Sequence, residues 1–219
     1  MPRLLFEKTG KAVWISHLDL MRVFQRSFKR AGLPLTHTHG YNPRPSVSIA
    51  LPLGVGIESC CELLDFDLDG MTVSLEEIKK RLNQTLVDGV RVLDVYDDGR
   101  KLKHLAYLSC RITFEYDRGI SQEGMNAIRE LFQQKALTVP KKSKNGVVDQ
   151  DIIPMIRSLE ITRQEDQTLV LDCVICCQNP TLNPGQFASA VGLHLPQWKP
   201  DFFRCQRMEL YDGEGAVFR

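Results

Sequence analysis

The sequence lacks the features of a membrane-embedded, secreted or cofactor-carrying protein. No apolar run approaches the roughly 18–20 residues that a membrane-spanning helix requires. The N-terminal segment has no long apolar region and no small-residue cleavage site, so we expect no signal peptide. The iron–sulfur motif C-x-x-x-C-x-x-C is also absent, and we expect no cofactor.

Seven cysteines are too irregularly placed for a disulfide framework. Their number is odd and two pairs are adjacent in sequence, which favours reduced thiols in a cytoplasmic protein. Cys173 and Cys176 form a C-x-x-C, but it lies in an apolar, β-branched segment typical of a buried strand. In a strand their side chains point to opposite faces, so we expect no metal site.

The length and periodicity of the chain predict two small domains. With 219 residues, of which 43% are apolar and 25% charged, the chain can bury a hydrophobic core. The first hundred residues predict the order β-α-β-β-α-β, typical of a ferredoxin-like domain. Ser16 or His17 begins the first helix, and Gly32 followed by Pro34 ends it. The expected segments are a hairpin or one bent strand over 3–8 and 12–15, helices over 18–31 and 74–86, and strands over 46–51, 61–68 and 90–96.

The second half repeats this order without a residue-by-residue repeat. The sequence thus predicts an α+β protein of two tandem ferredoxin-like domains with antiparallel sheets, covering 1–99 and 100–219. In the second domain we expect strands over 105–116, 136–139, 156–161, 168–177 and 204–210, helices over 121–133 and 183–191, and a basic hairpin tip over 140–146.

The net charge of +1 conceals an uneven distribution. Residues 1–45 carry eight cations and two anions, a net charge of +6, whereas residues 46–98 carry a net charge of −7. Residues 99–163 and 164–219 follow with +5 and −3. A near-neutral total excludes a bulk polycation but leaves room for a local surface that binds a polyanion.

The first predicted helix carries the densest group of cations. Spacings of three and four residues place Arg22, Arg26 and Lys29 on one face, with Arg30 beside it. Such a face can neutralise several phosphates of a nucleic acid, which makes binding depend on salt. The alternative is a solvated helix face, the commonest position of Lys and Arg.

A loop rich in Gly, Asn and Pro follows this helix, over residues 40–45. Prolines at 43 and 45 stiffen the loop, so that Tyr41 can stack on a base and Arg44 can hold a phosphate. Asn42 lies between them and belongs to the same candidate binding set. The alternative is a structural corner in which Tyr41 packs on the core.

Three histidines lie in or near these segments. His17 is the candidate catalytic group, because at the start of a cationic helix it can act as a base, a phosphate contact or a ligand. It can equally cap the helix or pair with Asp19. His37 and His39 are too few for a metal site by themselves, and their role stays open.

Several segments together resemble the signature of a known family. They are residues 14–26 and 29–34, the sequence Gly-Tyr-Asn-Pro-Arg-Pro over 40–45, and Leu-Pro-Leu-Gly-Val-Gly-Ile-Glu-Ser over 51–59. Through them the chain is similar to the radical-SAM-linked protein family, a domain of unknown function found alone or fused to radical-SAM proteins. The resemblance implies a bacterial cytoplasmic protein with a radical-SAM protein as partner and with neighbours in RNA metabolism, without an assigned reaction.

Three functions follow from these observations. The first is a non-catalytic accessory protein that binds RNA, a radical-SAM enzyme or both. The second is a metal-independent endoribonuclease that uses His17 or His37 with Arg44, since the tandem layout is similar to that of CRISPR repeat-processing enzymes. The third is a protein-interaction module whose acidic faces bind a basic partner. The candidate binding residues are His17, Arg22, Arg26, Lys29, Arg30, Tyr41, Asn42 and Arg44.

Overall fold

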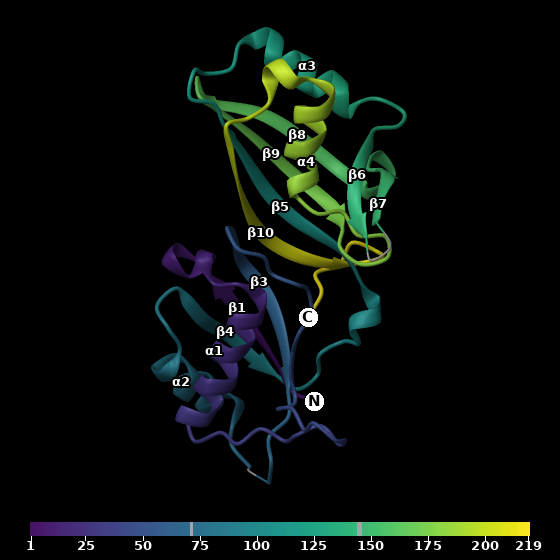
Figure 1. The fold of residues 1–219 in the computed structure, drawn as a ribbon. Helices are drawn as coiled ribbons and strands as arrows, with labels where there is room; N and C mark the ends of the chain where they lie inside the picture. Colours follow the sequence, from purple (N-terminus) through teal and green to yellow (C-terminus); the bar gives the residue numbers. More distant parts are fainter. Residues whose placement is uncertain (71, 144–145) are drawn as a thin grey trace. The chain divides into compact units, whose positions relative to one another are not determined.

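Two α+β units make up the structure, a computed structural model that describes residues 1–70, 72–143 and 146–219. Unit 1 comprises Met1–His104 together with Phe218–Arg219, and unit 2 comprises Leu105–Val217. Figure 1 shows helices and strands in both. Lys144, part of the predicted basic hairpin tip, lies outside the described residues.

Unit 1 has an antiparallel sheet with the strand order β4-β1-β3-β2. Apart from the segment after β1, the predicted strands and helices lie close to the predicted positions, because their apolar residues follow the periods of 2 and 3.6. The elements are β1 (Arg3–Lys8), the 3-10 helix η1 (Gly10–Trp14), α1 (His17–Arg30), β2 (Val47–Ile49), β3 (Ile57–Phe66), α2 (Leu75–Thr85), β4 (Val90–Tyr96) and the 3-10 helix η2 (Leu102–His104).

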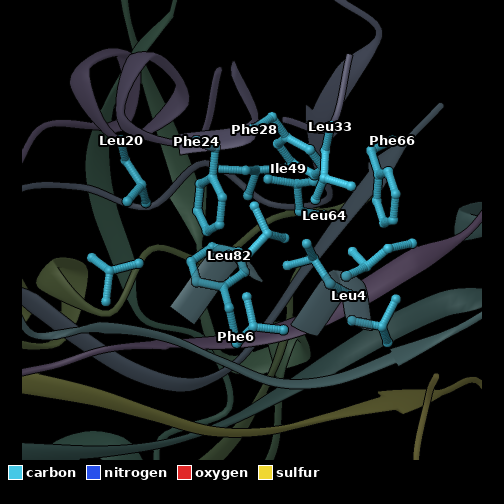
Figure 2. Packing of buried hydrophobic residues seen from close by; sticks show 14 of the residues in the cluster. Leu4, Phe6, Leu20, Phe24, Phe28, Leu33, Ile49, Leu64, Phe66 and Leu82 are labelled. Carbon is cyan, nitrogen blue, oxygen red and sulfur yellow. The ribbon is translucent and has the colours of Figure 1, made fainter. Parts of the chain in front are cut away.

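The core of unit 1 lies between this sheet and its two helices, which cover the same face (Figure 1). Phe24 of α1 meets Phe6 of β1 edge to face, with ring centroids 4.7 Å apart. One turn later Phe28 packs against Phe66 of β3 at 5.0 Å. Figure 2 shows these rings among the buried leucines. Burial of this apolar stripe fixes which face of α1 points outward.

The segment after β1 is a short helix and not the second arm of the predicted hairpin or bent strand. Ala12 donates to the carbonyl of Thr9 at 3.1 Å, and Ile15 donates to that of Ala12 at 2.9 Å. Both Ala12 and Val13 are buried, whereas a half-buried strand would bury only one of two successive residues. Gly10, with a φ of +56°, lets the chain turn into this helix.

Both ends of α1 have the predicted signals. The hydroxyl of Ser16 accepts a hydrogen bond from the amide of Asp19 at 3.2 Å and so caps the first turn. At the other end Leu33 donates to the carbonyl of Phe28 at 3.0 Å, and Gly32 donates to that of Lys29 at 3.2 Å. This is a Schellman motif, and it requires the left-handed φ of +67° that Gly32 adopts.

Unit 2 repeats the order of elements and contains one addition. Its antiparallel sheet has the strand order β10-β5-β9-β8, and β6 and β7 form a separate two-stranded sheet. The elements are β5 (Leu105–Glu115), α3 (Gln122–Phe132), β6 (Thr138–Ser143), β7 (Gly146–Asp151), η3 (Ile153–Met155), β8 (Ile156–Glu165), β9 (Thr168–Cys176), α4 (Gly185–His194), η4 (Pro196–Trp198) and β10 (Phe202–Asp212).

The paired strands β6 and β7 extend over more residues than the predicted strand over 136–139 and include described parts of the tip predicted over 140–146. The strand β7 was not predicted, because its two valines, Val147 and Val148, are adjacent and do not alternate with polar residues. In the structure both valines are exposed. The strand predicted over 168–177 is confirmed as β9, in which Cys173 is buried and Cys176 is half-buried, and both are free thiols.

Candidate nucleic-acid interface

Two of the eight cations in residues 1–45 are buried and cannot serve a binding surface. Arg3 pairs with Asp65 across β1 and β3, with 2.5 Å between Nε and the nearer carboxylate oxygen. Lys8 is fully buried, and its ammonium donates to the carbonyls of Val13, Ile15 and Gly54 at 2.9–3.2 Å. Both cations therefore stabilise unit 1 from within.

Arg22 is exposed but has an acidic neighbour on the same helix. Its guanidinium donates to Asp19 at 2.7 Å, and the hydroxyl of Ser16 donates to the other oxygen of that carboxylate at 2.7 Å. The hydrogen bond from Ser16 and the pair with Arg22 hold the pKa of Asp19 below its usual value. An exposed pair of this kind is weak, so Arg22 can still exchange Asp19 for another anion.

Arg30 serves as a tether between the two helices of unit 1. Its guanidinium donates to the main-chain carbonyl of Thr85, at the end of α2, and to the hydroxyl of Ser27 at 3.3 Å. The carbonyls of a last helical turn have no helical N–H partner, and Arg30 supplies one. Of the predicted binding cations, Arg30 thus has a role in the fold itself.

Arg26 and Lys29 are the cations of α1 that remain available. Both are exposed, and within the described residues neither side chain has a recorded hydrogen bond or ion pair. They lie on the outward face of α1, opposite the buried stripe of Phe24 and Phe28. Lys11 and Arg44 are exposed in the same way within the described parts of unit 1.

The loop predicted to be stiff is a small hairpin over residues 36–46. His37 pairs with Pro45, and Thr38 and Arg44 exchange two hydrogen bonds, from the amide of Thr38 to the carbonyl of Arg44 at 2.8 Å and from the amide of Arg44 to the Thr38 hydroxyl at 3.0 Å. Tyr41, at the tip, is 101% exposed, so the alternative in which it packs on the core is wrong. Asn42 and Arg44 are exposed beside it, in reach of a ligand.

A groove of about 400 Å³ separates α1 from this hairpin. Its lining, which defines the α1 groove, consists of Gln25 and Lys29 from α1, the connector over 32–35, and His37 and Pro45 from the hairpin. Lys29 and His37 therefore line one concave surface. Gln25 was not among the predicted residues, although its position one turn before Lys29 puts both on the same side of the helix.

His17 is half-buried and engaged with the loop that follows β2. Its Nδ1 accepts a hydrogen bond from the amide of Leu53 at 3.4 Å, and the amide of Gly56 in the same loop donates to the carbonyl of Val13 at 2.8 Å. The pairing with Asp19 that the sequence suggested is not made, because the carboxylate binds Ser16 and Arg22. The loop thus holds His17 apart from the α1 groove lining.

Two other kinds of site are absent from the described residues. Across residues 1–70, 72–143 and 146–219, no group of three or more His, Cys, Asp or Glu side chains is placed to hold a metal ion. In the same described stretches, no helix has the length and apolar character needed to span a bilayer.

The sequence matches, over residues 2–184, the model of a family described as "Uncharacterized protein conserved in bacteria (DUF2344)". The chain belongs to this family. All the cations and the α1 groove described above lie within the region that DUF2344 covers. No curated protein matches the chain.

A solved structure resembles this DUF2344 protein in fold only. A chain of "Crystal Structure of a Cbf5-Nop10-Gar1 Complex" is 10% identical with a TM-score of 0.51, covering 95% of this chain and 48% of its own. The present chain thus spans about half the length of that relative. "Crystal Structure of an Unknown Protein from Galdieria sulphuraria" is 8% identical with a TM-score of 0.27, covering 94% of this chain and 96% of its own. The first likeness supports a mixed α+β fold.

Proposed function

We propose that this protein binds RNA through α1 and the 36–46 hairpin and acts as an accessory protein without a catalytic centre of its own. The observation that carries the proposal is the juxtaposition of available cations with a groove. Lys29 lines the groove, Arg26 precedes it by three residues on the outward face of α1, and Arg44 adjoins Pro45 of the lining; all three cations are exposed. Unpaired cations bind phosphates with little desolvation cost, and their spacing suits a polyanion.

The exposed tip of the hairpin favours RNA over a simple anion. Tyr41 presents its whole ring to solvent, and an aromatic ring held on a short, hydrogen-bonded hairpin is a stacking platform for an unpaired base. Arg44, three residues on, supplies a cation for the adjoining phosphate. A protein that bound only inorganic anions would gain nothing from such a ring.

RNA binding is tested by fluorescence anisotropy with a labelled tRNA and a short labelled RNA, titrated over a range of salt concentrations. The variant Arg26→Ala/Lys29→Ala should weaken binding and reduce the slope of log affinity against log salt by about 1.5. Arg118→Ala/Lys135→Ala, which removes two exposed cations from unit 2, is the matched control. Equal losses in the two double variants, or no binding by the folded protein at low salt, would refute the proposal.

The same assay examines the endoribonuclease alternative. His17 has a structural partner in Leu53, whereas His37 lines the α1 groove beside Lys29. His37 is therefore the better candidate for a catalytic group. Cleavage of the labelled RNA that is lost in His37→Ala and retained in His39→Ala would make the protein an enzyme and replace the accessory role.

A radical-SAM protein is the partner that we propose from the family resemblance. One surface feature supports a protein contact: Trp14, Leu18 and Val55 are 65%, 68% and 54% exposed around the start of α1, where Trp14 lies against Gly56. Exposed apolar side chains that gather in this way are typical of interaction sites. Ribonuclease-resistant co-purification with a radical-SAM protein, lost in Trp14→Ala but not in the exposed-valine control Val147→Ala, tests this contact.

We also propose that units 1 and 2 are tandem ferredoxin-like domains of a cytoplasmic protein. The strand orders β4-β1-β3-β2 and β10-β5-β9-β8 support this, because each follows the same path through its own β-α-β-β-α-β series. Cysteines held outside disulfides throughout the described residues fit a reducing compartment.

A further inference from the structure

The α1 groove has an apolar floor and a polar lining. The connector over 32–35 forms the floor: Gly32 and Pro34 are exposed there, Leu33 and Leu35 are buried at 0% and 8% exposure, and Pro45 lines the hairpin side. The polar lining comes from Gln25, Lys29 and His37. Within the described parts of the chain, no hydrogen bond is recorded for these three polar side chains, so all three remain available to a ligand.

This combination matches the chemistry of a nucleotide. A base has two apolar faces, polar edges that both donate and accept, and an anionic phosphate at a fixed distance. An apolar floor takes a face, the Gln25 amide both donates and accepts, and Lys29 and His37 can donate to a phosphate. The volume of about 400 Å³ lies within the range of pockets that enclose small ligands.

We propose that the α1 groove holds one unstacked nucleotide of single-stranded RNA, with its base on the floor, the Gln25 amide at the base edge, and Lys29 with His37 at the phosphate. The inference rests on the proposed RNA binding and narrows its substrate class. A base in a duplex is paired and stacked, and its faces cannot reach a floor of this kind. Duplex RNA is therefore left with the exposed cations alone, and single strands bind more tightly.

The path of the strand follows from the same surface. Tyr41 lies at the tip of the hairpin whose base contributes His37 and Pro45 to the groove. A second base can stack on that ring while the first is held in the groove. Arg44 is in the hairpin between the two positions and serves the phosphates that link them.

The decisive experiment fills the groove without changing charge. Gln25→Trp places a large ring on its α1 wall, and Gln84→Trp makes the same change on the exposed side of α2. Binding is measured with a labelled single-stranded RNA and with the matching RNA duplex. We expect Gln25→Trp to weaken single-strand binding about tenfold, to leave duplex binding unchanged, and to melt at the same temperature as the control; Gln84→Trp should alter neither affinity.

The outcomes separate this inference from the proposed function. If Gln25→Trp is folded and binds the single strand as tightly as Gln84→Trp, the groove proposal is overturned, while loss of binding in Arg26→Ala/Lys29→Ala still upholds RNA binding. If the unaltered protein binds neither RNA, the proposed function fails first. Shifts of the Gln25 side-chain amide signal in NMR spectra on adding uridine 5′-monophosphate would support the groove directly, and unchanged signals at saturating nucleotide would count against it.

Discussion

The guanidinium of Arg30 donates a hydrogen bond to the main-chain carbonyl of Thr85, and the hydroxyl of Thr85 donates in return to the carbonyl of Ser27 at 3.2 Å. These contacts join the ends of α1 and α2. Arg26, one turn earlier on α1, is exposed and has no recorded side-chain partner among the described residues. Two arginines four positions apart therefore have different roles: Arg30 joins α1 to α2, and Arg26 faces solvent.

Exchanging each arginine for alanine should separate stability from binding. We expect Arg30→Ala to lower the free energy of unfolding by about 1 kcal/mol, because the Thr85 carbonyl loses a charged donor. Arg26→Ala should leave stability within about 0.5 kcal/mol and should weaken RNA binding more than Arg30→Ala does. Urea unfolding and anisotropy measure the two effects, and a stability loss in Arg26→Ala as large as in Arg30→Ala would contradict the division.

Lys8 offers a second test of a cation that serves the fold. Lys8→Met keeps the length of the side chain but removes the donors that reach the carbonyls of Val13, Ile15 and Gly54. We expect the free energy of unfolding to fall by about 1.5–3 kcal/mol, measured by urea unfolding. Lys11→Met, the same change at an exposed position of η1, is the control and should cost less than about 0.5 kcal/mol.

The regular elements were predictable because their signals are local. Ser16 and Gly32 mark the ends of α1 within one residue, and the strand predicted over 90–96 has those bounds in the structure. The prediction failed for segments whose apolar residues follow neither the helical nor the strand period. The η1 segment is set by the turn at Gly10 and by contacts with Lys8, and β7 exposes two successive valines.

Which cations are buried in unit 1 and which are exposed could not be predicted from one sequence. Arg3, Lys8 and Arg26 are all basic residues of the same segment, and the sequence does not distinguish them. In the structure Arg3 pairs with Asp65, 62 positions away, and Lys8 donates to the carbonyl of Gly54, 46 positions away. Such contacts depend on strand register and loop path, which periodicity does not contain. The sum of +6 over residues 1–45 therefore overstated the charge that is available to a ligand.

The α1 groove was hidden for the same reason. The helix face predicted Lys29, but the position of His37 depends on its pairing with Pro45. That pairing requires residues 36–46 to fold back as a hairpin, which Thr36 and Asp67 fix through hydrogen bonds at 3.0 Å. These hydrogen bonds join residues 31 positions apart, and periodicity in the sequence does not predict them.

The cap of α1 should give a pH-dependent contribution to stability. The pKa of Asp19 is lowered first by the hydrogen bond from Ser16 and then by Arg22, so its contribution is present above the usual aspartate pKa and is lost as pH falls through the lowered value. In Ser16→Ala, the pKa of Asp19 should rise towards its usual value. The carboxyl carbon signal of Asp19, followed by NMR through an acid titration, measures this.

A cap without an acidic partner is the control for this effect. The hydroxyl of Ser121 caps α3 by accepting from the amide of Gly124 at 3.1 Å, and that residue has no side chain to pair with it. Ser16→Ala and Ser121→Ala should each cost about 1 kcal/mol at neutral pH. Below the aspartate range only the cost of Ser16→Ala should shrink, and a parallel decline in both variants would disprove the role of Asp19.

Gly124, the third residue of α3, lies where neighbouring side chains leave no space for a Cβ atom. A Cβ on Gly124 would lie 2.7 and 2.8 Å from two ring carbons of Trp198, which occupies the space where a glutamate would complete a capping box. In an open helix Gly→Ala stabilises by about 0.5–1 kcal/mol, so the sign of the effect is informative. We expect Gly124→Ala to destabilise by about 1–3 kcal/mol and to change the fluorescence of Trp198 in a Trp14→Phe background. Gly213→Ala, where no atom lies within 4 Å of the new Cβ, should change neither stability nor Trp198 fluorescence; a stabilised Gly124→Ala variant would show that the ring moves aside at no cost.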